Sequence, residues 1–146
     1  MTASPRRGLL AAGVAGFGFS ALVDVLLLHH VLQWHHLLSN VYDPATVSGL
    51  RANVLADGVF SLAMLGVMFA GLGWLWRSER RTAEPLAVRP LAGAALVGLG
   101  AFDLFDVAVN HVLLGLHHAT HGPGFYDPHW AVASVAFIVG GALLVR

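Results

Sequence analysis

The sequence lacks both cysteine and lysine, and only 11% of its 146 residues are charged. The absence of cysteine excludes disulfides, thiolate metal ligands and cysteine nucleophiles. Eight arginines balance eight acidic residues, so the chain has no basic excess of the kind that nucleic-acid binding requires. With 57% hydrophobic residues and a mean hydropathy of +0.72, the composition also disfavours a disordered chain and an ordinary soluble domain. Against this apolar background stand nine histidines and seventeen glycines.

Long apolar stretches dominate the chain, and four of them approach or exceed the roughly 20 residues that a helix needs to cross a bilayer. They cover residues 8–38, 50–76, 91–118 and 130–145. The last is the shortest, and its start is the least well defined. The pattern predicts an all-α fold, an integral-membrane four-helix bundle that forms a single domain over residues 1–146 and has the lipid bilayer as its main partner.

The arginines are distributed unevenly about these stretches. Only Arg51 lies on one side, and the other seven flank the opposite ends of the helices: Arg6, Arg7, Arg77, Arg80, Arg81, Arg89 and Arg146. Because arginine-rich segments stay in the cytoplasm, both termini and the middle loop are expected there. This orientation predicts a multi-pass membrane protein with both termini in the cytoplasm.

The first and third stretches align with each other without gaps, at one constant offset along the chain. Eight positions are identical: Gly16/Gly98, Gly18/Gly100, Asp24/Asp106, Val25/Val107, His29/His111, Leu32/Leu114, His35/His117 and His36/His118. The bundle is therefore expected to consist of two parallel helical-hairpin repeats, at about 8–77 and 88–146. Both begin on the same side of the membrane, so their pseudo-twofold axis should lie along its normal and place the polar residues opposite one another.

Each repeat carries the motif Asp-x4-His-x5-His-His. With 100° and 1.5 Å per residue, the polar side chains of the third helix fall within about 140° of arc. His111 then lies about 7.5 Å beyond Asp106, and the His117–His118 pair about 17 Å beyond it. On a straight helix His29 and His36 are about 10.5 Å apart, too far to bind one ion. Two sites, or one site with an entry path, would follow.

Charged residues inside a membrane are costly and indicate function, and mixed histidine and carboxylate ligands suit Zn, Fe, Mn or Cu(II). The predicted lower site contains Asp24, His29, Asp57, Asp106 and His111, and the upper site contains His35, His36, His117 and His118. The sequence leaves open the roles of His30, on the predicted lipid side, and of His121 and His129 near the loops.

Other interpretations of these residues remain open at this point. The histidine pairs could be interfacial polar groups, and His29 and His111 could form structural hydrogen bonds. Asp24 and Asp106 could orient histidines instead of binding metal. Asp43 and Asp127 each precede a proline and are expected to form turns or caps. Asp103 fits a solvated group as well as a ligand.

The segments 24–36, 56–60 and 106–118 together resemble a family of small bacterial four-helix predicted membrane proteins, a domain of unknown function. The resemblance covers nearly the whole chain. The sequence departs from the family pattern at five positions: His30, Ser61, Asp106, Asn110 and Val112, where the pattern has Gln, His, Glu, Asp and His. The resemblance implies four membrane helices in a bacterial inner (plasma) membrane but no function, so the chemistry has to come from the residues.

The leading hypothesis is an integral-membrane metalloprotein with a His/carboxylate transition-metal site, one ion or two, in the outer half of the bilayer. Copper, iron and zinc are not distinguished by the sequence. A redox or oxygen-using role, as in a metal-dependent oxidoreductase with a membrane-soluble substrate such as a quinone, fits ligand sets that leave open positions. The alternatives are a copper or zinc carrier, transporter or chaperone for a respiratory enzyme, and a b-type haem protein with paired axial histidines.

Overall fold

The computed structural model describes residues 5–82 and 84–146, and every element of regular secondary structure in these ranges is a helix. Helix α1 (Pro5–Val23) continues into a π-helical segment, η1 (Asp24–Val31), and α3 (Val88–Phe105) continues into η2 (Asp106–Leu113). Helices α2 (Val47–Glu79) and α4 (Asp127–Val145) complete the fold. Within the described ranges, four helical spans are long and apolar enough to cross a membrane. The predicted all-α four-helix membrane bundle is confirmed.

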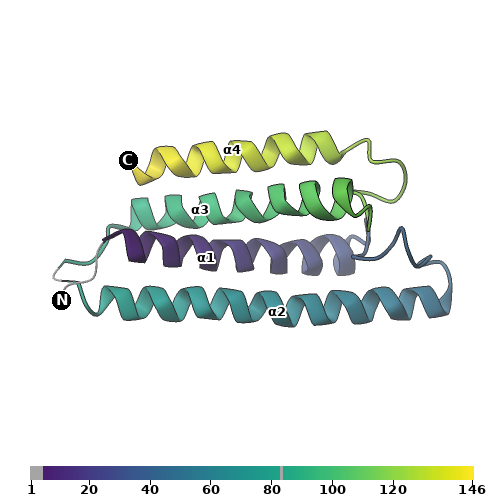
Figure 1. The fold of residues 1–146 in the computed structure, drawn as a ribbon, viewed down its shortest axis with the longest axis horizontal. Coiled ribbons are helices and arrows are strands. Elements are labelled where there is room, and N and C mark those ends of the chain that lie inside the picture. The colour runs from purple at the N-terminus through teal and green to yellow at the C-terminus, as the bar shows by residue number, and fades with distance from the viewer. Residues whose placement is uncertain (1–4, 83) are drawn as a thin grey trace.

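The four helices lie in a row in the order α4, α3, α1, α2 (Figure 1). The central helices α1 and α3 run in the same direction and pack against each other, and each packs against the next helix in its own hairpin. Among the described residues, α2 and α4 do not touch one another. The start of α1 and the end of α4 lie at the same end of the bundle along the helix axes, here called the terminal end. The loops that follow η1 and η2 lie at the opposite end, here called the loop end.

Glycines set the close contacts between the helices. A Cβ atom on Gly16 would overlap the backbone at Ala95, and one on Gly98 would overlap the backbone at Gly13. Gly18 approaches the backbone of α2 in the same way, and its counterpart Gly100 approaches α4. Small residues at these positions let backbones approach closely, which is how helices gain packing energy in a membrane. The repeat that is visible in the sequence is therefore also a repeat of the packing.

We expect Gly98→Ala to destabilise the bundle by about 1–3 kcal/mol, because the added methyl group must push α1 and α3 apart. Gly66→Ala in α2 is the matched control, because no atom outside the backbone of its own helix lies within 4 Å of the added Cβ. The free energy of unfolding of each variant can be measured by titration with a denaturing detergent. Equal stability of the two variants would contradict the assigned role of Gly98.

At the loop end the first and third helices end earlier than the predicted ranges 8–38 and 91–118. The last turns change to i→i+5 hydrogen bonds, from Leu32 N to Leu27 O and from Leu114 N to Val109 O, each 2.8 Å long. The chain then reverses at Gln33 (φ 51°) and at its repeat counterpart Gly115 (φ 60°), both in the left-handed region that commonly ends helices. The residues that follow fold back toward the helix ends.

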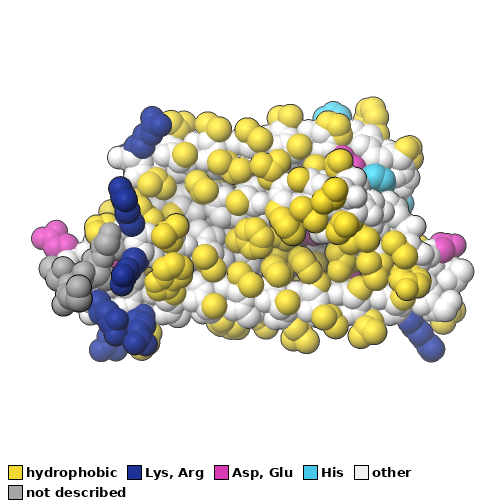
Figure 2. All heavy atoms as spheres, viewed as in Figure 1, with side chains coloured by type: hydrophobic (Ala, Val, Ile, Leu, Met, Phe, Trp, Pro, Cys, Tyr) yellow, Lys and Arg dark blue, Asp and Glu magenta, His cyan; other side chains and the backbone are white. Residues whose placement is uncertain are grey.

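The outer surface of the bundle is apolar. Hydrophobic side chains cover the middle of the molecule, and basic side chains gather mainly at the terminal end (Figure 2). Only 11% of the most apolar window of α2 and of α4 is buried within the molecule, against 50% for the first span and 44% for the third. This distribution is that of a membrane protein whose outer helices face lipid and whose polar groups lie inside.

Candidate metal centre

The π-helical turns bring an aspartate and a histidine together in each repeat. In η1 the distance from Asp24 Oδ2 to His29 Nε2 is 3.3 Å, and in η2 the distance from Asp106 Oδ2 to His111 Nε2 is 2.9 Å. On a regular α-helix, residues five apart would point about 140° from one another. The i→i+5 hydrogen-bonded turn instead places them nearly above one another, and such turns are frequent at functional sites.

The chain reversal adds a second histidine to each half. His35 folds back beside His29, with ring centroids 4.5 Å apart, and His117 lies beside His111 at 4.6 Å. The rings of His35 and His117 stack on one another across the two repeats, 4.8 Å apart and within 7° of parallel. The predicted upper site is therefore divided. Because the helices end before His35 and His117, these two histidines join His29 and His111 in one cluster, while His36 and His118 stay outside it.

His35 and His117 are held by carbonyl groups of the opposite repeat. His35 Nδ1 donates to Ala119 O at 3.0 Å, and His117 Nδ1 donates to Leu37 O at 3.1 Å. A carbonyl oxygen only accepts hydrogen bonds, so in the neutral rings each Nδ1 carries the proton and each Nε2 keeps its lone pair. Burial lowers the pKa of His35 below its usual range, which keeps this ring neutral at physiological pH.

His29 is oriented by a carboxylate from α2. Its Nδ1 lies 2.8 Å from Asp57 Oδ1, and His36 Nδ1 lies 2.8 Å from Asp57 Oδ2. The backbone N–H of Leu37 also donates to Asp57, at 2.9 Å. Asp57 is fully buried, and its two oxygens thus hold two histidines and the returning backbone in place.

Asp127 performs the same task in the second repeat. It accepts hydrogen bonds from His111 Nδ1 at 3.0 Å, His118 Nδ1 at 2.6 Å and the backbone N–H of Ala119 at 2.9 Å. The expectation that Asp127 only forms a turn or cap was wrong. It precedes a proline, as Asp43 does, but Asp43 indeed makes a local turn through Ala45 N. The structural counterpart of Asp127 is Asp57.

No direct signal in the sequence indicates this equivalence. Asp57 and Asp127 lie closer together along the chain than the repeat offset that relates His29 to His111. The reason is that Asp57 lies well inside α2, while Asp127 is the first residue of α4. The second helices of the two hairpins, α2 and α4, therefore contribute their aspartates from different positions along their lengths.

Four buried histidine Nε2 atoms make no hydrogen bond of good geometry among the described residues: those of His29, His35, His111 and His117. Three of them nevertheless lie 2.9–3.5 Å from an aspartate oxygen, and His35 Nε2 is the exception. Each of these residues is at most 3% exposed. Ligand atoms lie within 4.8 Å of one another in three groups, namely His29 with His35 and His117, Asp106 with His111 and His117, and His29 with His36 and Asp57. Groups of this composition and size can hold a metal ion.

The nine predicted ligands thus separate into two sets by position. Six converge at the centre: Asp24, His29, His35, Asp106, His111 and His117. The other three, His36, Asp57 and His118, lie beside the centre. His36 contacts Asp57, and His118 contacts Asp127.

The polar residues left open by the sequence lie outside the centre. His30 Nε2 is 4.0 Å from Asp57 Oδ2, and His129 packs on Phe125 and Tyr126. His121 lies beside His36, with ring centroids 6.4 Å apart. Asp103 is buried and accepts a hydrogen bond from Ser20 at 2.8 Å, so it is not a solvated group.

Residues 11–146 match a family described as "Predicted membrane protein (DUF2243)". The chain belongs to this family. No match is found among the curated proteins or the solved structures. The DUF2243 match includes every residue of the centre and agrees with the four apolar spans, but its description names no reaction, ligand or partner.

Proposed function

We propose that this DUF2243 protein is an integral-membrane metalloprotein whose centre holds two transition-metal ions between the repeats. The observation that carries this proposal is a buried cluster of four histidine Nε2 atoms that make no hydrogen bond of good geometry among the described residues, with aspartate oxygens 2.9–3.5 Å from three of them. Burying a polar atom that lacks a good hydrogen bond costs about 1–3 kcal/mol. A cation bound to the lone pairs of these Nε2 atoms would remove that cost.

The distances within the centre support metal coordination. Asp106 Oδ2 lies 2.9 Å from His111 Nε2 and 3.5 Å from His117 Nε2, and Asp24 Oδ2 lies 3.3 Å from His29 Nε2. Two ligands that each lie about 2.0–2.2 Å from one metal ion are separated by roughly 2.9–3.5 Å in octahedral or tetrahedral geometry. The observed separations fall in this range, so an ion fits between these atoms without a rearrangement of the backbone.

Symmetry and charge support two ions over one. Each repeat contributes one aspartate and two histidines, Asp24 with His29 and His35, or Asp106 with His111 and His117. The ligand atoms of the second set all lie within 4.8 Å of one another, whereas in the first set Asp24 lies 3.3 Å from His29, and His35 groups with His29 and His117. Three protein ligands leave a position open for another ligand, as catalytic sites do. The carboxylates that contact these histidines are two central and two flanking, a formal charge of −4 that two divalent cations would neutralise.

In this assignment Asp57 and Asp127 orient ligands without binding the metal. Each accepts from the Nδ1 of one central histidine, which directs the Nε2 of that histidine into the centre. Metal-bound histidines usually donate their second N–H to a carboxylate or a carbonyl group. His35 and His117, held by backbone carbonyls, follow the same rule.

Within this proposal, redox or oxygen chemistry is the best-supported reaction class. The nitrogen and oxygen ligand set suits iron, copper, manganese or zinc. A position near the loop end of the membrane suits a membrane-soluble reductant such as a quinol. The buried ligands favour a resident ion over one carried to a respiratory enzyme, and the close packing of the four rings favours small ions over a haem.

Metal loading followed by oxygen uptake tests the proposed function. We expect detergent-purified protein, stripped and reloaded, to bind about two equivalents of Fe(II), Cu(II) or Zn(II) per chain. Oxygen consumption with a short-chain quinol is expected for the iron or copper form and not for the zinc form, because zinc has no redox chemistry. Two bound ions with no oxygen uptake in any form would contradict the redox role alone. Accumulation of metal in vesicles would instead favour the carrier.

A further inference from the structure

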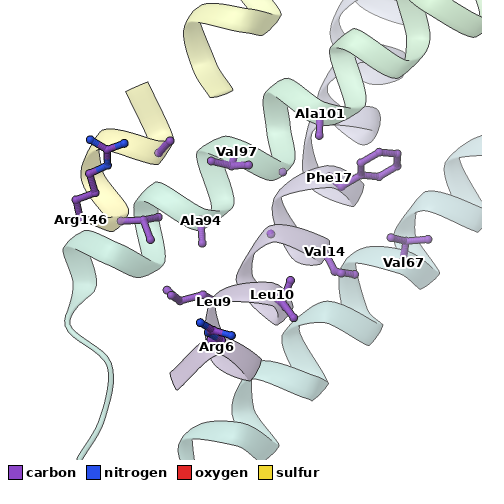
Figure 3. Close-up of a pocket in the computed structure, with 14 residues that line it drawn as sticks. Arg6, Leu9, Leu10, Val14, Phe17, Val67, Ala94, Val97, Ala101 and Arg146 are labelled. Atoms are coloured by element: carbon purple, nitrogen blue, oxygen red, sulfur yellow. The ribbon is translucent and has the colours of Figure 1, made fainter. Parts of the chain in front are cut away.

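A second feature of the molecule lies far from the metal centre, in the half of the bundle near the terminal end. It is an apolar groove of about 840 Å³ on one broad face. All four helices contribute to its lining, and α1 and α3 touch within it at Gly13 and Gly98. Leu10 of α1, Ala94 of α3 and Val67 of α2 are among the lining side chains (Figure 3). The volume is typical of a small-molecule site.

The groove combines an apolar body with a basic mouth. Apart from Arg6 and Arg146, its lining consists of aliphatic residues, glycines and Phe17. The two arginines come from opposite ends of the chain, one from the start of α1 and one from the residue after α4 (Figure 3). A ligand that complements this lining has an anionic head and a long hydrocarbon tail. Guanidinium groups bind phosphate through several hydrogen bonds at once, which makes a phosphate head a good match.

The length of the groove matches one leaflet of a bilayer. Arg6 and Phe17 lie at opposite ends of it (Figure 3), and their separation along the axis of α1 is about 16 Å. The hydrocarbon core of one leaflet is about 15 Å thick. Phe17 packs edge-on against Phe102, with centroids 5.3 Å apart, at the end nearest the middle of the membrane.

We propose that this groove is a binding site for an anionic phospholipid of the leaflet at the terminal end. Its phosphate would bind Arg6 and Arg146, and one acyl chain would lie along α1 and α3. A helix from a second copy of the chain fits less well. A parallel second copy would bring its own Arg6 and Arg146 to the same basic mouth, where like charges repel.

Native mass spectrometry with an equimolar mixture of phosphatidylglycerol and phosphatidylcholine tests the proposal. We expect the full-length protein to retain one phosphatidylglycerol molecule in preference to phosphatidylcholine. R6Q/R146Q should reduce this retention about tenfold or more. The matched control is R77Q/R81Q, which removes the same charge from exposed positions outside the groove and should leave retention unchanged. A101F, which fills the groove, should reduce the retention of both lipids.

Equal retention of the two lipids by the unsubstituted protein would contradict head-group recognition. Equal losses of lipid retention in R6Q/R146Q and R77Q/R81Q would show that the lipid is attracted to the basic surface in general and that the groove is not a specific site. Dimers in place of bound lipid would assign the groove to a second copy of the chain. Circular dichroism and metal content check that the variants fold, and because the groove and the centre are separate, lipid binding and metal binding can fail independently.

Discussion

His29→Ala combined with His111→Ala is expected to lower the metal content of the purified protein from about two ions per chain to below a tenth of an equivalent. Each substitution removes one of only three proposed protein ligands in its half and also removes the histidine nearest to a buried carboxylate, Asp24 or Asp106. The two substitutions together therefore affect both ions. Elemental analysis of detergent-purified protein after exposure to metal measures the outcome.

The matched control replaces two histidines that lie outside the centre, His121 and His129, with alanine. It removes the same number of imidazoles from the same end of the molecule and should leave the metal content unchanged. Full metal retention by the first double variant would contradict the ligand assignment. Equal loss in both double variants would point to adventitious binding by histidine-rich loops.

Asp127→Asn should weaken metal affinity by about 10–100-fold, the usual effect of changing a carboxylate that orients a metal-bound histidine. The substitution keeps the shape of the side chain, but it replaces one acceptor oxygen with a donor and removes the negative charge opposite His111 and His118. Asp57→Asn should have an effect of similar size through His29 and His36. Competition against a chelator of known affinity measures the change.

Asp43→Asn is the matched control for both variants, because Asp43 precedes a proline as Asp127 does but only closes a local turn. It should leave metal affinity within about a factor of two. If Asp127→Asn behaves like Asp43→Asn while Asp57→Asn weakens binding, the proposed equivalence of the two flanking carboxylates is incorrect.

The arrangement of the helices was readable from the sequence because it depends on repeated features. The constant offset between the repeats predicted that the first and third helices share their environment, and Gly16 and Gly98 do occupy matching contacts between α1 and α3. The apolar spans predicted the number of membrane helices. Their ends were predicted less well, since leucine and tryptophan recur among the polar residues of 32–38, beyond the end of η1.

The geometry of the centre was not readable because it arises from departures from the regular helix. On a regular helix with 100° per residue, Asp24 and His29 point in different directions. The π-helical turn instead brings Asp24 Oδ2 within 3.3 Å of His29 Nε2. Nothing in the composition of residues 24–31 indicates this turn. Gly115 suggests a left-handed backbone conformation, but its counterpart Gln33 does not. The first repeat therefore contains no residue that predicts the chain reversal by which His35 returns to the centre.

The two flanking carboxylates differ in how visible they are in the sequence. Asp57 was selected as a candidate because it lies within an apolar helix, where a charge is conspicuous. The sequence predicts a turn or a cap at Asp127, because this residue precedes a proline at the edge of an apolar span. Only the three-dimensional contacts with His111 and His118 assign it to the centre.

X-ray absorption spectroscopy of the metal-loaded protein tests the central claim most directly, because it reports the ligands and the neighbouring metal together. The account predicts nitrogen and oxygen ligands at about 2.0–2.2 Å, imidazole scattering from two histidines per ion, and a second metal at about 3.5–4 Å. A shell of oxygen alone, without imidazole scattering and without a metal neighbour, would contradict a centre built from the histidines of both repeats.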